Sequence, residues 1–225
     1  MMPMTPSIAI GLSLTVGYVL GAIPFGYLAG RMKGIDIRQH GSGNIGATNA
    51  IRVLGKGVGI PVFILDLVKG WLPVWLAKLW LSSAGVEGAM LTTVAVGTGL
   101  AAVLGHMFTF WLAFKGGKGV ATTAGVLIGV APDGMLAGLL IWLLVFFATR
   151  YVSLASMLAS AAVSGWLTFR MARSGEWEPV MLSFGVLIMV LVFVRHRSNI
   201  GRILDGTESR MGGGKKKEAD EPKVG

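Results

Sequence analysis

The chain has 225 residues, of which 53% are hydrophobic and only 14% charged, and its mean hydropathy is +0.70. Soluble domains usually carry about 25% charged residues, and no fold this small could hide so much apolar surface from water. The absence of cysteine excludes disulfides, thiolate metal sites and a cysteine nucleophile. We therefore expect an integral membrane protein, whose net charge of +9 favours anionic lipid and an anionic substrate over nucleic acid.

Apolar runs long enough to cross a bilayer follow one another along the chain. A hydrocarbon core about 30 Å thick requires roughly 20 apolar residues per helix. The sequence predicts an all-α transmembrane bundle of about seven spans, over residues 7–30, 58–81, 88–104, 120–131, 135–149, 152–171 and 179–194. The first is uncharged, and no basic region precedes it, so we interpret it as a span and not as a cleaved signal.

Segment 120–131 is the exception among these spans. At 1.5 Å per residue it is too short to cross the membrane alone, and it ends at the turn signal Pro132-Asp133-Gly134. Two interpretations stay open. Either the glycine-rich stretch before it is sunk in the membrane, or the segment turns back.

The distribution of lysine and arginine predicts the orientation. With seven crossings and the N-terminus outside, most of the 20 basic residues fall on the inner side, as expected for cytoplasmic loops. The C-terminus is then cytoplasmic. We expect a membrane domain over residues 1–211 and a disordered tail over 212–225. The tail consists mainly of glycine and charged residues and has no apolar run that could be buried.

Three polar segments lie between the spans, and this topology places all of them on the cytoplasmic side. Their sequences are GSGNIGATNAIR (41–52), GHMFTFWLAFKGGKGVATT (105–123) and RHRSNIGRILDGTE (195–208). Independent loops would fall on both faces, so the coincidence predicts one composite site.

The first segment contains G-x-G-x-x-G, but a membrane helix precedes it where a dinucleotide fold would have a β-strand, so we reject that fold. Glycines still let backbone N–H groups approach an anion, and Arg52 offers a planar fork that suits phosphate. The alternative is a flexible turn with a basic flank. The predicted phosphate-binding residues are Ser42, Gly43, Asn44, Thr48, Asn49 and Arg52.

The second segment contains a run of glycines and lysines that is not a Walker A loop, because Gly119 stands where that loop needs Ser or Thr. It is a cationic glycine nest that opens an apolar helix, which suits a phosphate. The alternative is a marker of the inner face with a snorkelling lysine. The predicted binding residues are Lys115, Gly116, Gly117, Lys118 and Gly119.

The third segment offers Arg195, His196 and Asn199. His196 and Asn199 share a helical face if the last span continues, while the alternative is an interfacial histidine facing headgroups. We expect Glu208 to pair with neighbouring basic residues. Within the second span, Lys69 either pairs with Asp66 or reaches the cytoplasmic site. The three histidines are too scattered to suggest a metal site, and no cofactor is predicted.

Together the three segments resemble the motifs of the bacterial acyl-phosphate-dependent glycerol-3-phosphate acyltransferase family. The family pattern GSGNxGATNxxR matches residues 41–52, a histidine followed by FKGGKG matches His106 and 114–119, and RHxxNIxR with a later G-x-E matches 195–208. The likeness runs from the first span to about Glu208. Three long motifs in the same order make it specific.

The resemblance implies transfer of a fatty acyl group from acyl phosphate to the 1-hydroxyl of sn-glycerol 3-phosphate, at the cytoplasmic side of the bacterial inner membrane. It implies that Ser42 and Arg52 are essential, that His196 and Asn199 serve activity, and that Glu208 is structural. It adds Lys69 and the glycine-lysine loop to the substrate site. The cytosolic enzyme that produces acyl phosphate becomes a candidate partner.

Rival readings come from other classes of protein. A transporter or channel for organic phosphates would suit the basic residues, but the sequence lacks the internal repeat that transporters usually show. A scaffold that only binds anionic lipid would need no clustered glycines and asparagines. The sequence also has no G-x-S-x-G elbow, and no aspartate stands five residues after a histidine.

Overall fold

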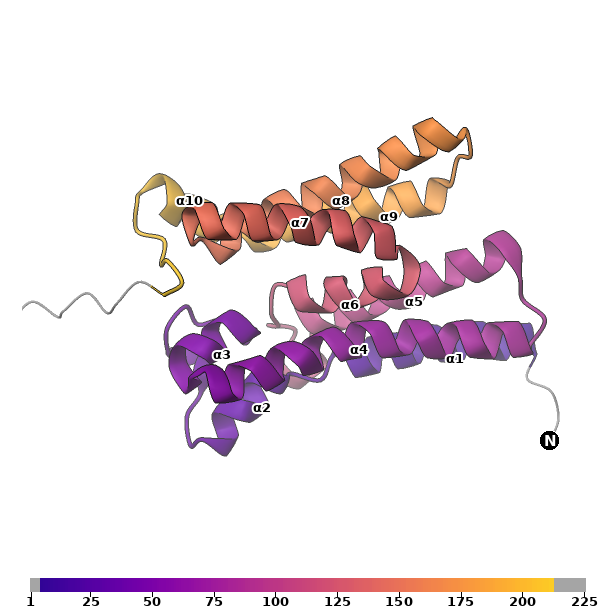
Figure 1. Cartoon of the computed structure of the whole chain (residues 1–225). Coiled ribbons are helices and arrows are strands. Elements are labelled where there is room, and N and C mark those ends of the chain that lie inside the picture. Colours follow the sequence, from indigo (N-terminus) through magenta and orange to yellow (C-terminus); the bar gives the residue numbers. More distant parts are fainter. Residues whose placement is uncertain (1–4, 213–225) are drawn as a thin grey trace, which may run out of the picture.

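A computed structural model describes residues 5–212, and every regular element within them is a helix (Figure 1). This confirms the predicted all-α class, whereas the predicted disordered tail beyond Gly212 lies outside the described residues. The helices are α1 Pro6–Gly21, α2 Phe25–Met32, η1 Ile37–Gln39, α3 Ala47–Leu54, α4 Lys56–Ser83, α5 Gly88–Met107, η2 Phe110–Leu112, α6 Val120–Val130, α7 Pro132–Thr149, α8 Val152–Ser174, α9 Pro179–Arg195 and α10 Arg197–Leu204.

Five segments are long and apolar enough to cross a membrane: Pro6–Met32, Lys56–Ser83, Gly88–Leu112, Pro132–Thr149 and Val152–Ser174. The pair α9 and α10 makes a sixth if its 57° bend is treated as a break within one span. The short helix α6 would be the seventh. The count of seven and the orientation of the termini stay predictions.

The first span is broken between α1 and α2, and neighbouring helices satisfy the carbonyls that the break leaves without helical partners. Pro24 follows Ile23, and proline has no N–H to continue the helix. Thr109 Oγ1 donates to the carbonyl of Ala22 at 2.5 Å, and Lys69 Nζ donates to the carbonyl of Ile23 at 2.7 Å. A break in a membrane helix is tolerated where such partners exist.

The helices form two layers. In one, α1 packs on α5 and α4, and α6 lies on α4; in the other, α7, α8 and α9 pack side by side (Figure 1). Gly70 and Gly125 bring α4 and α6 into backbone contact, because a Cβ on either glycine would overlap a carbonyl of the facing helix. Helices α7, α8 and α9 thus form a second layer, which packs against the layer of α1, α4, α5 and α6.

Helix α6 begins and ends inside the bundle. In the loop before it, Gly117 and Gly119 are buried, and Gly117 donates to the carbonyl of His106 on α5 at 3.1 Å. At its other end, Lys78 Nζ from α4 donates to the carbonyl of Gly129 at 2.6 Å, which supplies a cation to the unpaired C-terminal carbonyls. The glycine stretch before α6 packs on α5, and whether α6 crosses the membrane or turns back stays a prediction.

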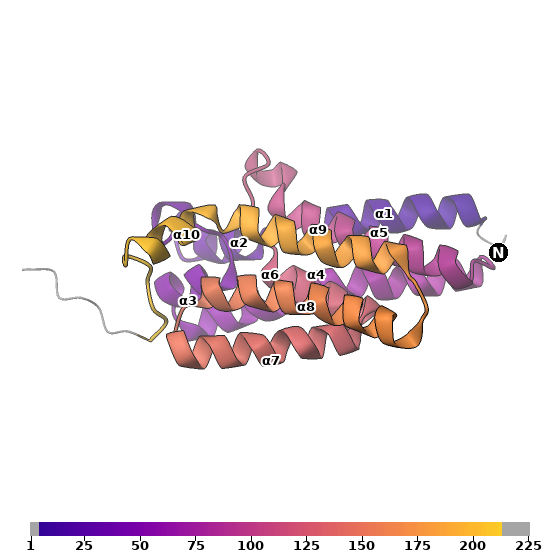
Figure 2. The ribbon, with the colours of Figure 1, turned by 90° about the horizontal axis from the view of Figure 1, so that it is seen from above.

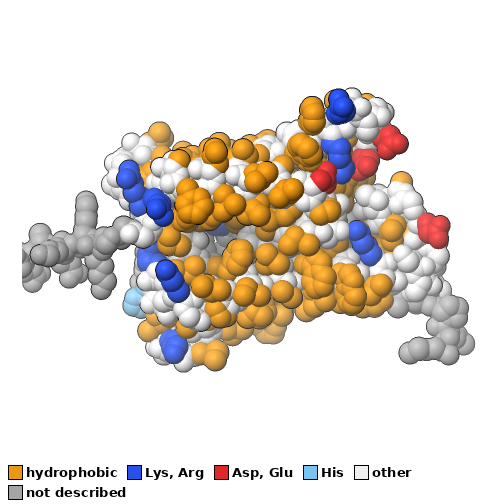
Figure 3. Space-filling view, viewed as in Figure 1, with side chains coloured by type: hydrophobic (Ala, Val, Ile, Leu, Met, Phe, Trp, Pro, Cys, Tyr) orange, Lys and Arg blue, Asp and Glu red, His pale blue; other side chains and the backbone are white. Residues whose placement is uncertain are grey.

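Charged side chains separate toward the two ends of the molecule. A broad band of apolar side chains covers the middle, and lysine and arginine gather at the end that carries α2, α3 and α10 (Figure 3). The view turned by 90° places these three helices together at the end away from the N-terminus (Figure 2). The first and third predicted polar segments therefore lie at one end of the bundle.

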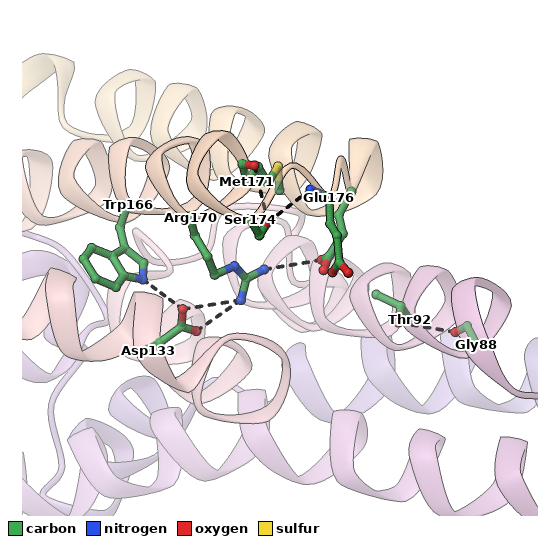
Figure 4. Close-up of polar contacts among 9 residues, drawn as sticks. Gly88, Thr92, Asp133, Trp166, Arg170, Met171, Ser174 and Glu176 are labelled. Carbon is green, nitrogen blue, oxygen red and sulfur yellow. Dashed lines mark hydrogen bonds and ion pairs between the residues drawn. The ribbon is translucent and has the colours of Figure 1, made fainter.

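A polar network joins three helices near the opposite end. Asp133 at the start of α7 accepts from Trp166 Nε1 at 2.9 Å and from Arg170 Nη1 at 3.4 Å (Figure 4). Arg170 Nη2 also donates to Glu178 at 3.3 Å, just before α9 begins. This network fixes α7, α8 and α9 to one another far from the basic end.

Candidate active site

One cavity of about 630 Å³ lies between the two layers, and the three predicted polar segments all contribute to its wall. Its polar part is lined by Ser42, Asn44, Thr48, Asn49, Arg52, Asp66, His106, Lys118, Ser153, His196, Asn199, Arg202 and Glu208. Its apolar part is lined by Phe63, Leu127, Leu139, Trp142, Phe146, Val163, Ile188 and Val192. A single cavity therefore joins a region lined by polar and cationic side chains to a region lined by apolar side chains.

Asn49 organises the loop of the first segment. Its side chain is buried, its Oδ1 accepts from the amide of Ser42 at 2.9 Å, and its Nδ2 donates to the carbonyls of Asn44 at 2.9 Å, His40 at 3.0 Å and Ile37 at 3.3 Å. These bonds engage both ends of the amide. Although Asn49 touches the cavity, its contacts are those of a scaffold for the loop that presents Ser42.

Some amides of this first loop are bonded within the segment. Gly43 donates to the carbonyl of His40 at 3.1 Å and Gly46 to Asn44 Oδ1 at 2.7 Å. Other amides have no acceptor among residues 5–212: those of Asn44 and Ile45 in the loop, and those of Ala47 and Thr48 where α3 begins. A helix N-terminus of this kind favours an anion.

Arg52 is the cation of the first segment that faces the cavity. It lies on α3, its side chain is exposed, and its guanidinium has no hydrogen-bond partner within the part of the chain that the structure describes. The planar fork is therefore available to a ligand. Ser42 is also exposed and lies at the cavity wall.

The structure corrects the predicted nest of the second segment. The amide of Gly116 donates to the carbonyl of Met107 at 3.1 Å and that of Gly117 to the carbonyl of His106 at 3.1 Å, so neither is free for phosphate. A Cβ at Gly117 would overlap the His106 ring. These glycines serve close packing of the loop on α5, and the cavity is reached by the residues after them, Lys118 and Gly119.

Two other predicted phosphate ligands are occupied elsewhere. Arg195 donates to the carbonyls of Gly116 and Gly117 and is not part of the cavity wall. Lys69 Nζ lies 2.7 Å from Asp66 Oδ1 and 2.7 Å from the carbonyl of Ile23, so the internal ion pair is the observed arrangement. Gly43 and Lys115 are exposed and do not line the cavity either.

The third segment bends, so the last span does not continue straight through His196 and Asn199. Helix α9 ends at Arg195 and α10 begins at Arg197, with a 57° change of direction. His196 and Asn199 are nevertheless both buried and both at the cavity wall. His196 Nδ1 lies 2.8 Å from the carbonyl of Val192, which can only accept, so this nitrogen carries the proton and Nε2 is the unprotonated one.

Glu208 connects α8 and α10 at the cavity wall. Its Oε1 accepts from Ser153 Oγ on α8 and from Asn199 Nδ2 on α10, both at 2.6 Å, and its Oε2 accepts from Arg202 Nε at 2.7 Å. Burial alone would raise the pKa of this carboxyl, but the three donors hold it below its usual value. The expected pairing with a basic neighbour is confirmed, and these contacts suit the predicted structural role.

Lys118 is the half-buried cation of the cavity. Its Nζ donates to Asn199 Oδ1, which links the second segment to the third. Burial lowers the pKa of Lys118 to about 8, and the neighbouring cations Arg202, Arg195 and Arg52 act in the same direction against the charge of Glu208. A bound dianion would reverse this trend, so the site is electrostatically prepared for phosphate.

Several wall residues were not predicted as part of the site. Asp66, His106, Ser153 and Arg202 line the cavity. His106 lies within the second motif, which was the one available signal, and Arg202 lies within the third. Ser153 is an unremarkable serine at the start of an apolar helix, and only its contact with Glu208 distinguishes it.

Residues 11–206 match the family model described as glycerol-3-phosphate acyltransferase. A glycerol-3-phosphate acyltransferase of Aquifex aeolicus is 45% identical over 195 residues, covering 86% of this chain and 95% of that protein, and one of Geobacter sulfurreducens is 43% identical, covering 87% and 94%. The crystal structure of PlsY (YgiH), an integral membrane glycerol 3-phosphate acyltransferase in its glycerol 3-phosphate form, superposes with a TM-score of 0.79 at 41% identity, covering 90% of this chain and 96% of that one. Its lysophosphatidic acid form gives 0.76 at 40% identity, covering 90% and 95%.

Proposed function

This chain belongs to the glycerol-3-phosphate acyltransferase family, and we propose that it moves a fatty acyl group from acyl phosphate to the 1-hydroxyl of sn-glycerol 3-phosphate. The products are lysophosphatidic acid and inorganic phosphate. The observation that carries the proposal is the single cavity whose wall combines the three polar segments with an apolar groove. Family membership also favours an acyltransferase over a transporter or channel for organic phosphates.

The polar part of the cavity suits two phosphorylated substrates. Arg52 and Lys118 supply positive charge, and the N-termini of α3 and α6 supply amides without helical acceptors. Ser42 and Thr48 add hydroxyls at the wall. The phosphate of the acceptor and the phosphate of the donor would both lie near cations here. The Glu208 carboxylate at the same wall is already paired with Arg202.

The apolar part suits the acyl chain of the donor. Phe63 on α4 and Leu139 on α7 stand on the two layers and are 44% and 40% exposed. Their exposure supports a groove that opens sideways toward lipid, and the space-filling view shows a recess between the layers (Figure 3). A chain lying there would keep its carboxyl end beside the cationic residues.

The chemistry we propose is direct transfer. The acceptor's hydroxyl oxygen attacks the acyl carbon, the bond from that carbon to the phosphate oxygen breaks, and inorganic phosphate leaves. Because the donor is a mixed anhydride with a good leaving group, positioning and charge stabilisation supply most of the rate. The hydroxyl proton goes to His196 Nε2 or to the phosphate of the acceptor. Trapping an acylated Ser42 would refute direct transfer.

We place the enzyme in the bacterial inner membrane with seven crossings, its N-terminus outside and its active site cytoplasmic. The gathering of lysine and arginine at the end with α2, α3 and α10 supports that orientation (Figure 3). A cytoplasmic site would receive acyl phosphate from the cytosolic enzyme that makes it. Accessibility labelling of Arg52→Cys and Asn199→Cys from one side of sealed vesicles tests this arrangement, and labelling from opposite sides would refute it.

Turnover by purified protein tests the function. The protein in detergent should convert acyl phosphate and labelled glycerol 3-phosphate into labelled lysophosphatidate, whereas a transporter has nothing to cross there. Arg52→Ala should lower kcat/KM by about 10²–10³-fold, the loss typical of one key electrostatic donor. Arg197→Ala, an exposed arginine outside the cavity wall, is the matched control. Unchanged turnover in Arg52→Ala would remove this residue from the site.

A further inference from the structure

The Arg195 guanidinium holds two backbone carbonyls of the loop between α5 and α6. Its Nη2 donates to the carbonyl of Gly116 at 2.8 Å and to that of Gly117 at 2.7 Å, and its Nε donates to the carbonyl of Gly117 at 3.1 Å. Its Cζ lies 5.5 Å from the centre of the Phe108 ring. All these contacts are with the protein and none faces the cavity.

The loop that receives Arg195 is itself fixed on its other side. The amides of Gly116 and Gly117 donate to the last carbonyls of α5, and Gly117 packs directly on the buried His106 ring. Only glycine fits there, because a Cβ would overlap that ring. The loop is therefore held between α5 and the end of α9, and Lys118 follows it immediately.

Arg195 also joins the two helical layers at the site. It is the last residue of α9, which packs chiefly on α8, while the loop belongs to the layer of α4 and α5. His196 and Asn199 follow it on one side of the contact, and Lys118 follows on the other. Arg195 therefore links the loop that precedes Lys118 to the helix end that precedes His196 and Asn199.

We propose that Arg195 is a positioning residue, which fixes Lys118 relative to His196 and Asn199 and does not bind phosphate. This inference rests on the proposed function for its kinetic test alone. Its physical basis is the planar guanidinium, which spans two carbonyls at once. A lysine at this position has the same charge, but its flexible chain is one bond shorter and lacks the second donor nitrogen, so it cannot reproduce the bond that Nε makes to Gly117 or the fixed plane of the guanidinium.

The first test separates positioning from phosphate binding. For a phosphate ligand, Arg195→Lys keeps the charge, so kcat survives and KM for glycerol 3-phosphate rises. For a positioning residue, Arg195→Lys should lower kcat by about 10–100-fold, the cost of an ångström-scale misplacement, with KM changed less than about threefold. Arg52→Lys, at the residue that we assign to phosphate, supplies the opposite reference pattern. A raised KM with full kcat in Arg195→Lys would overturn the proposal.

The second test measures the geometry without turnover. The chain contains no cysteine, so Lys115→Cys on the loop and Ser198→Cys on α10, both exposed, can carry a pair of spin labels. The distance distribution between the labels should broaden or shift with Arg195→Lys and stay unchanged with Arg197→Lys. An unchanged distribution in Arg195→Lys would overturn the proposal.

The two readouts can fail independently of the enzyme assignment. If wild-type protein makes no lysophosphatidate while Arg195→Lys still broadens the distribution, the proposed function fails and the positioning contact stands. Arg195→Gln, which keeps a planar amide but loses the charge and the second donor group, replaces the lysine variant if that one does not fold. It should show the same broadening.

Discussion

Lys118 Nζ donates a hydrogen bond to Asn199 Oδ1 across the cavity wall, and Asn199 Nδ2 donates in turn to Glu208 Oε1 at 2.6 Å. The lysine stands before α6 and the asparagine on α10, so this contact joins residues 81 positions apart. A substrate phosphate would compete with Asn199 for the ammonium. The lysine is thus held at the place where it is needed, by a neutral partner that an anion can displace.

Activity should depend on the charge of Lys118. Because burial lowers the pKa of this lysine to about 8, the ammonium is lost as pH rises above that value. We expect kcat/KM for glycerol 3-phosphate to fall about tenfold per pH unit on the alkaline side, since only the charged form holds phosphate. Lys118→Arg should move the alkaline limb upward, because arginine stays charged. An alkaline limb at the same pH in that variant would contradict this assignment.

The same lysine predicts how stability changes at alkaline pH. Its folded-state pKa of about 8 lies below the usual value of 10.5, so the fold favours the neutral form. The free energy of unfolding of the substrate-free protein should therefore rise between pH 8 and 10.5 and stay level below pH 8. Chemical unfolding across this range checks the sign, with Lys118→Met as the variant that should lack the rise.

Glu208 should contribute mainly to stability. Glu208→Ala removes the acceptor of Ser153, Asn199 and Arg202, and hydrogen bonds to a charged group are worth roughly 1.5–3 kcal/mol each before non-additivity. We expect a fall of several degrees in Tm. Because the folded-state pKa of Glu208 is lowered, its stabilisation is present above the ordinary carboxyl pKa and is lost as pH falls through the folded value. A Tm equal to wild type at pH 7 would contradict the role.

Asn49 should act through the loop that it supports. Asn49→Asp keeps the shape but removes the Nδ2 donor, leaving the carbonyls of Ile37, His40 and Asn44 without it. Buried polar groups left unpaired cost about 1–3 kcal/mol each, so both Tm and kcat/KM should fall. Gln39→Ala, an exposed neighbour, is the control. If Asn49 were only a phosphate ligand, KM would rise while Tm stayed constant.

Arg170 should affect stability and leave catalysis intact. It bridges Asp133 and Glu178 in the part of the bundle away from α2, α3 and α10 (Figure 1). Both ion pairs are partly exposed, and such pairs are worth about 0–1 kcal/mol each. Arg170→Ala should lower Tm by a few degrees with kcat/KM within about twofold of wild type, and Arg173→Ala should change neither. A tenfold loss of kcat/KM at normal Tm would show coupling between the ends.

The sequence alone determined the solvent and the chemistry of this protein. Hydropathy and span length indicated that the helices lie in lipid. Both quantities can be read along the sequence without knowledge of tertiary contacts. The three polar segments identified Ser42, Arg52, Lys118, His196 and Asn199, all of which line the cavity. Their residue types were sufficient for this, since cations and small donors near a helix N-terminus have few other reasons to cluster.

Tertiary structure decided which polar groups are free. Some residues are of types that commonly bind phosphate but are engaged elsewhere, namely Gly116, Gly117, Lys69 and Arg195. Their donors are bonded to backbone carbonyls or to Asp66. The bend after Arg195 and the contribution of Ser153 likewise depend on contacts between distant segments. A hydrogen-bond donor can serve a ligand only when no neighbour has engaged it, and the neighbours of a residue are fixed by packing between helices that the order of residues does not reveal.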